Sequence, residues 1–191
     1  MVAAPAKPQV EILRRRFTVE EYYRLLDAGI LGEDDRVELI EGEIVEMSPM
    51  KPRHANTIER STMRLVLAVH PTATVRVQCP IQVGTRSLPE PDLAIGRADR
   101  PTDAHPAPAD IFVAIEVADS SLEYDRAINL PLYATAGIPE TWLCNLGNGT
   151  IERHSAPRDG RYTQIAIFGQ GNVLTSLALP GIGIPVAELL G

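Results

Sequence analysis

The eight residues 111–118, Ile-Phe-Val-Ala-Ile-Glu-Val-Ala, constrain the fold more than any other segment. All but one of them are apolar, and several are β-branched, so the run predicts a strand. A nearly unbroken apolar run is typical of a central strand covered on both faces. Glu116 interrupts it, and a carboxylate without a partner there would carry a large desolvation cost. We therefore expect Glu116 to have a specific partner or a chemical role.

The segments around this strand predict an α/β fold of the α+β kind, with helices on the faces of a mixed sheet. Residues 54–70 carry apolar side chains at helical spacing and end at Pro71. Residues 123–137 predict a second such helix, with Pro131 in its opening turns or causing a kink. The strand-like segments are 75–83, 91–96, 140–146, a hairpin around residues 158–160 and one further short strand.

The N-terminal part adds elements to this core. Residues 1–16 lack periodicity and are predicted to be a flexible arm, followed by a single domain over 17–191. Thr18 and Glu21 form a capping-box pattern that predicts a first helix, ending at Gly29. Two short strands then follow around Glu41-Gly42, which predicts a hairpin.

Composition limits the kinds of function. A net charge of −7 and a pI near 5.1 argue against bulk electrostatic coating of nucleic acid, so any DNA binding would be local. Cys79 and Cys144 lack ligand spacing and are interpreted as core residues. No signal-like or membrane-length segment is visible, so we expect a cytoplasmic protein. A chain of 191 residues folds without a structural metal, and any metal would therefore serve chemistry.

Asp92 stands at the head of the segment 91–96, one strand before Glu116. Adjacent strands would bring the two carboxylates to one end of the sheet. Two such oxygen ligands, completed by water and a substrate phosphate, are a common way to hold Mg²⁺. In the alternative, Glu116 pairs with Arg126 or Arg76 and Asp92 caps a turn. The spacing alone leaves both open.

Five stretches in this order resemble the Uma-type endonucleases of the PD-(D/E)XK restriction-endonuclease-like superfamily. They are residues 37–49, 52–54, 89–95, 114–121 and 125–143. The resemblance covers nearly the whole chain from Phe17 onward. It implies a restriction-endonuclease-like core, with an added N-terminal helix and β-hairpin and with C-terminal strands.

The resemblance also implies a function, the hydrolysis of DNA phosphodiester bonds with Mg²⁺ or Mn²⁺ held by Asp92 and Glu116. It further implies that Glu38 in the hairpin supports the site, although Glu38 can equally be a solvent-facing acid. His54 is a candidate for contact with the substrate phosphate, the alternative being a simple helix-start histidine. A homodimer is expected, because nucleases that cut both strands often pair two sites.

The sequence departs from the family at the lysine. The superfamily motif places a lysine two residues after the glutamate, where this chain has Ala118. Uma-type members carry it in the following helix instead, and the aligned residue here is Asn129, which donates hydrogen bonds without a charge. Arg126 or Lys51 would be the substitute cation. Two functions therefore remain, a working endonuclease with Asn129 or Arg126 on the phosphate, and a catalytically impaired nucleic-acid-binding or assembly module.

Overall fold

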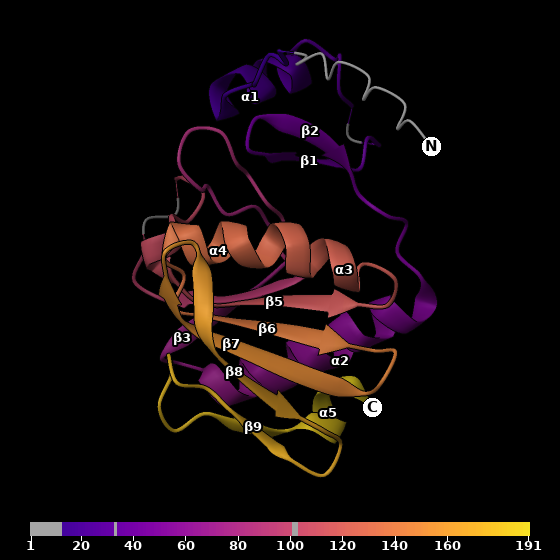
Figure 1. Ribbon diagram of the computed structural model, residues 1–191, viewed down its shortest axis with the longest axis vertical. Helices are drawn as coiled ribbons and strands as arrows, with labels where there is room; N and C mark the ends of the chain where they lie inside the picture. The colour runs from indigo at the N-terminus through magenta and orange to yellow at the C-terminus, as the bar shows by residue number, and fades with distance from the viewer. Residues whose placement is uncertain (1–12, 33, 101–102) are drawn as a thin grey trace, which may run out of the picture.

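A six-stranded mixed sheet forms the centre of the computed structural model, which describes residues 13–32, 34–100 and 103–191 (Figure 1). The strand order is β3-β4-β5-β6-β7-β8; β5 and β6 are parallel and the other neighbours antiparallel. The strands are β3 (Ala73–Val77), β4 (Leu93–Arg97), β5 (Ile111–Ala118), β6 (Glu140–Asn145), β7 (Thr150–Arg158) and β8 (Arg161–Phe168). The predicted mixed sheet is confirmed.

Strand β5 is the central strand that its apolar run predicts. It lies between β4 and β6, and residues on both of its faces are buried. Val113 and Val117 belong to the apolar cluster under one helical layer, while Ala114 and Ala118 belong to the cluster on the opposite face. Side chains alternate along a strand, so Glu116 shares the face of the two alanines. Their small side chains allow the helix on that face to approach the sheet closely.

Helices cover both faces of the sheet. Helix α2 (Pro52–Val69) lies on one face and buries Ile58, Leu65 and Val69. The other face carries a continuous helical segment whose parts are α3 (Leu122–Tyr124), the π-helical turn η2 (Asp125–Asn129) and α4 (Leu130–Ala136). Pro131 follows the π turn, which accommodates the missing amide of the proline and keeps the segment helical. Gly137, with φ 79°, ends the segment.

The N-terminal elements form a further layer next to α4 (Figure 1). Helix α1 (Val19–Asp27) begins with the predicted capping box, in which Thr18 and Glu21 exchange hydrogen bonds of 3.2 and 3.0 Å. Strands β1 (Val37–Ile40) and β2 (Glu43–Glu46) form the predicted hairpin, and Glu41 and Gly42 both have positive φ. Most of the predicted N-terminal arm, residues 1–12, lies outside the described residues.

One predicted strand is shorter in the structure than expected. The segment 75–83 is a strand only as far as Val77, because Gln78 has a left-handed φ of 46° and Pro80 has no amide to donate. The following Cys79 is therefore only half-buried, and its interpretation as a core residue was wrong, whereas Cys144 is buried as predicted.

The C-terminal tail holds more structure than the single short strand predicted for it. It contains the strand pair β9 (Val173–Thr175) and β10 (Gly183–Pro185), which lies outside the main sheet, and helix α5 (Val186–Leu190), which packs on α2. A 3-10 turn, η1 (Pro108–Asp110), precedes β5. Within the described ranges no helix has the length and apolar character that crossing a membrane requires.

Candidate active site

The structure brings Asp92 and Glu116 together at one end of the central sheet. Leu93, the first residue of β4, pairs with Ile115 of β5, which places Asp92 beside Glu116 in the antiparallel register. The backbone amide of Asp92 lies 3.5 Å from Oε2 of Glu116. The juxtaposition expected from the order of the strands is therefore present.

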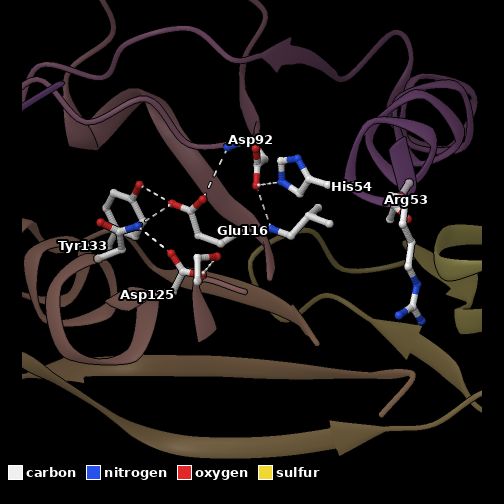
Figure 2. Close-up of polar contacts among 10 residues, drawn as sticks. Arg53, His54, Asp92, Glu116, Asp125 and Tyr133 are labelled. Carbon is white, nitrogen blue, oxygen red and sulfur yellow. Dashed lines mark hydrogen bonds and ion pairs between the residues drawn. The ribbon is translucent and has the colours of Figure 1, made fainter. Parts of the chain in front are cut away.

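Both carboxylates line a cavity of about 250 Å³ that also receives Glu38, His54 and Asp125. Strand β1 supplies Glu38, the first turn of α2 supplies His54, and η2 supplies Asp125. Figure 2 shows the side chains of Asp92, Glu116, His54, Asp125 and Tyr133 gathered at this point. Asp125 is a site residue that the sequence reasoning missed. The available signal was its position four residues before Asn129, on the same side of a helix.

One oxygen of Asp92 is held by the protein. Oδ2 accepts a hydrogen bond of 2.8 Å from the backbone amide of Val117 and lies 3.0 Å from Nε2 of His54 (Figure 2). Oδ1 accepts no hydrogen bond from the described residues. The carboxylate is thus fixed in orientation, while one of its oxygens stays available for a ligand.

Glu116 is held in the same one-sided way. Its Oε1 accepts a 2.6 Å hydrogen bond from the hydroxyl of the fully buried Tyr133 and a 3.4 Å contact from Nδ2 of Asn129. Among the described residues, only the amide of Asp92 contacts its Oε2, at 3.5 Å. Burial raises the pKa of Glu116 well above its ordinary value, and the charges of Asp92 and Asp125 raise it further.

The alternative ion pairs of Glu116 do not form. Arg126 is paired with Glu123 and Glu152 and is not among the residues that line the cavity. Arg76 donates to the carbonyl of Pro80. In the structure the guanidinium of Arg126 pairs with Glu152 of strand β7. Its contact with a substrate phosphate stays a prediction from the sequence.

Glu38 and Asp125 have both of their oxygens occupied. Glu38 accepts hydrogen bonds of 3.2 Å from the amide of Glu90 and from the hydroxyl of Tyr124, and it is buried rather than solvent-facing. Asp125 accepts 2.7 Å from the hydroxyl of Ser121 and 2.9 Å from Nδ2 of Asn129. Burial raises the pKa of each carboxyl to about 6.

Basic groups lie at the mouth of the cavity rather than at its carboxylates. Arg36 and Lys51 line it, and Lys51 lies 3.9 Å from Asp119. Arg53 points away from the carboxylates in Figure 2 and donates to the carbonyl of Leu146. The pKa of His54 is raised by its hydrogen bond to Asp92, which outweighs the opposite effect of burial.

Comparisons with known proteins agree with this architecture. The model of the Uma2 family, described as "Putative restriction endonuclease", matches residues 19–187. The chain belongs to this family. Its fold is also similar to that of a crystal structure from Anabaena variabilis, described as a "putative nuclease belonging to DUF820". That similarity has a TM-score of 0.70 at 16% identity and covers 91% of this chain and 97% of the other. A search among curated proteins gave no match.

This member of the Uma2 family has a lysine at neither of the expected positions. Ala118 is buried within an apolar cluster that includes Leu130 and Leu143. Asn129 lies in the cavity wall, where its amide nitrogen bridges Asp125 and Glu116. Its Oδ1 is buried without a hydrogen-bond partner in the described structure. Asn129 therefore orients two carboxylates without neutralising either of them.

The donor set of the cavity fits a hard divalent cation. Asp92 and Glu116 share this space with Glu38 and Asp125, and within the described ranges only His54 forms an ion pair with any of these four carboxylates. No three His, Cys, Asp or Glu side chains in those ranges form a ready-made metal cage. Mg²⁺ typically takes one or two carboxylates and completes its shell with water and phosphate. The open oxygens of Asp92 and Glu116 meet that requirement.

Proposed function

We propose that this Uma2-family chain is a metal-dependent DNA endonuclease that hydrolyses phosphodiester bonds, with Mg²⁺ or Mn²⁺ held by Oδ1 of Asp92 and Oε2 of Glu116. One observation carries the proposal: each carboxylate is fixed through one oxygen and leaves the other open at the same cavity. Glu38 and Asp125, whose oxygens are already hydrogen-bonded, add negative charge around the ion.

The bound ion would supply the positive charge that polarises the phosphodiester and makes water acidic enough to attack it. The residues of the chain keep the ligands in place. Tyr133 and Asn129 hold one oxygen of Glu116, and the amide of Val117 and His54 hold one oxygen of Asp92. Because these groups are ordered before substrate arrives, little reorganisation accompanies the reaction.

The absence of a lysine at position 118 or 129, beside the two metal-binding carboxylates, limits the expected rate. A positioned group that stabilises charge in the transition state typically contributes about a hundredfold to a thousandfold. Asn129 offers the substrate at most a neutral donor, and its amide hydrogens are already used by Asp125 and Glu116. We therefore propose a slow nuclease in which the cations at the cavity mouth, Arg36 and Lys51, contact the DNA backbone.

A second candidate function is a non-catalytic module that binds nucleic acid or takes part in an assembly. Asn129 at the family's lysine position favours it. The carboxylate cluster argues against a non-catalytic module. Several acids that share a buried cavity destabilise the fold unless a cation neutralises them.

Plasmid nicking tests the proposal. Purified protein is incubated with supercoiled plasmid and Mg²⁺ or Mn²⁺, beside Asp92→Ala and Glu116→Ala variants prepared in the same way. We expect slow nicking that requires the divalent ion and disappears in both variants. Nicking no faster than that of the variants would refute the endonuclease and favour the non-catalytic module.

A further inference from the structure

A second cavity, of about 330 Å³, adjoins the carboxylate cavity. It lies between the β1–β2 hairpin and the segment formed by η2 and α4. Tyr124 lines both cavities, and its hydroxyl donates to Glu38 in the first. The apolar residues that line the second cavity are Ile40, Val45, Ala127, Ile128, Pro131 and Leu132.

The polar groups of this second cavity indicate what it can accept. Arg16 donates 3.1 Å to the carbonyl of Glu41 and forms a 3.0 Å ion pair with Glu43. The cavity wall thus contains two acidic side chains for one arginine, and that arginine is already paired. A phosphate would be repelled there, whereas a neutral flat group with hydrogen-bonding edges would meet apolar walls, an aromatic ring and polar atoms.

We propose that this cavity binds an unstacked nucleobase of the DNA strand whose neighbouring phosphate lies at Asp92 and Glu116. The inference rests on the proposed nuclease function and adds a substrate class, single-stranded or locally unpaired DNA. Unstacked bases are recognised by aromatic and apolar side chains, with polar atoms contacting their edges. Because Tyr124 lines both cavities, we place the base in the second cavity and its adjoining phosphate in the first.

The burial of the carboxylates supports the same substrate class. Glu116 is only 6% exposed and Glu38 only 7%. The phosphates of an intact duplex lie on the outside of a wide cylinder, whereas a single strand can bend and place one phosphate inside a narrow cavity. The net charge of −7 also disfavours tight binding of the densely charged phosphates of a duplex.

The test compares two fluorescein-labelled probes by anisotropy, a short thymidine oligonucleotide and an abasic strand of the same length. EDTA keeps both probes uncut. The two strands carry equal numbers of phosphates, so the acidic site affects both alike. Base stacking on an aromatic side chain contributes about fivefold or more to affinity per base, and we expect at least that preference for the thymidine strand.

A variant that fills the second cavity tests whether the preference for the thymidine strand arises there. Ala127 is exposed on the helical segment and lines the second cavity, so Ala127→Trp should fill that cavity without disturbing the core. We expect this variant to lose the preference for the thymidine strand. Leu67→Trp serves as the matched control, because Leu67 is 70% exposed on α2, on the opposite face of the sheet, and its substitution should leave the preference intact.

Each outcome separates the two proposals. Equal affinity for the two probes, no measurable binding of either, or a preference that survives in Ala127→Trp overturns the base-binding cavity. A preference that disappears in Ala127→Trp, found together with an absence of plasmid nicking, supports the base-binding cavity and refutes the endonuclease.

Discussion

Replacing Asn129 by lysine should place a positive charge beside Asp125 and Glu116, where the wild-type chain has a neutral amide. In the wild-type structure the Asn129 amide nitrogen lies 2.9 Å from Oδ1 of Asp125 and 3.4 Å from Oε1 of Glu116. A lysine at this position is longer, so its ammonium would pass these oxygens and reach further into the cavity. It would remain close to both carboxylates and to the position proposed for the substrate phosphate.

The size of the effect follows from these contacts. Coulomb's law gives about 4 kcal/mol for each opposite-charge pair separated by ~4 Å at an effective dielectric constant of ~20. The desolvation of a buried ammonium offsets much of the gain from the two carboxylates. The remaining effect is stabilisation of the charge that grows on the phosphate, and one such group is worth about a hundredfold in rate. We therefore expect Asn129→Lys to nick plasmid about a hundred times faster than the wild-type protein.

The assay is single-turnover nicking at saturating Mn²⁺ with protein in excess. Asn129→Met is the matched control, because methionine has nearly the length of lysine and no charge. Equal rates for the lysine and methionine variants would refute a role for positive charge at this position.

Two further predictions concern the groups around the carboxylates. Tyr133→Phe removes the buried hydroxyl that donates to Glu116, so chemical denaturation should show a loss of about 1–3 kcal/mol in unfolding free energy; an unchanged value would contradict the structural role of this bond. Glu38 and Asp125 have folded-state pKa values of about 6, above those of the unfolded chain. Between about pH 4 and 6 the folded protein therefore binds more protons, and stability should fall as pH rises through this window. Above pH 6, Mg²⁺ should offset that loss of stability. Thermal melts at several pH values, with Mg²⁺ or with EDTA, measure both effects. A melting temperature that rises with pH between about 4 and 6 in EDTA would contradict the prediction.

The main elements of the fold follow from local sequence patterns. The run at 111–118 predicts the central strand, and the order of segments predicts the placement of Asp92 beside Glu116. Strands β9 and β10 could not be predicted individually from such patterns. Each of them is only three residues long, and they are fixed by pairing with one another rather than by periodicity.

The environment of the carboxylates was less predictable. Asp125 and Arg126 are neighbours in the sequence, but the helical turn directs only Asp125 into the cavity, and the π-helical geometry of this turn has no clear signature in the sequence. Tyr133 lies among apolar helix residues and is equally interpreted as a core side chain. The hydrogen bond from the Tyr133 hydroxyl to Glu116 depends on the packing of helix α4 against the small residues of β5, which the sequence pattern does not show.

Calorimetric titration with Mg²⁺ or Mn²⁺ tests directly whether Asp92 and Glu116 hold a divalent ion. We expect one divalent ion to bind per chain, and we expect Asp92→Asn and Glu116→Gln each to abolish binding. Asp125→Asn should retain the ion, because both oxygens of Asp125 are already hydrogen-bonded within the protein. No binding by the wild-type chain, or binding that survives in the Asp92 and Glu116 variants, would contradict the proposed metal site.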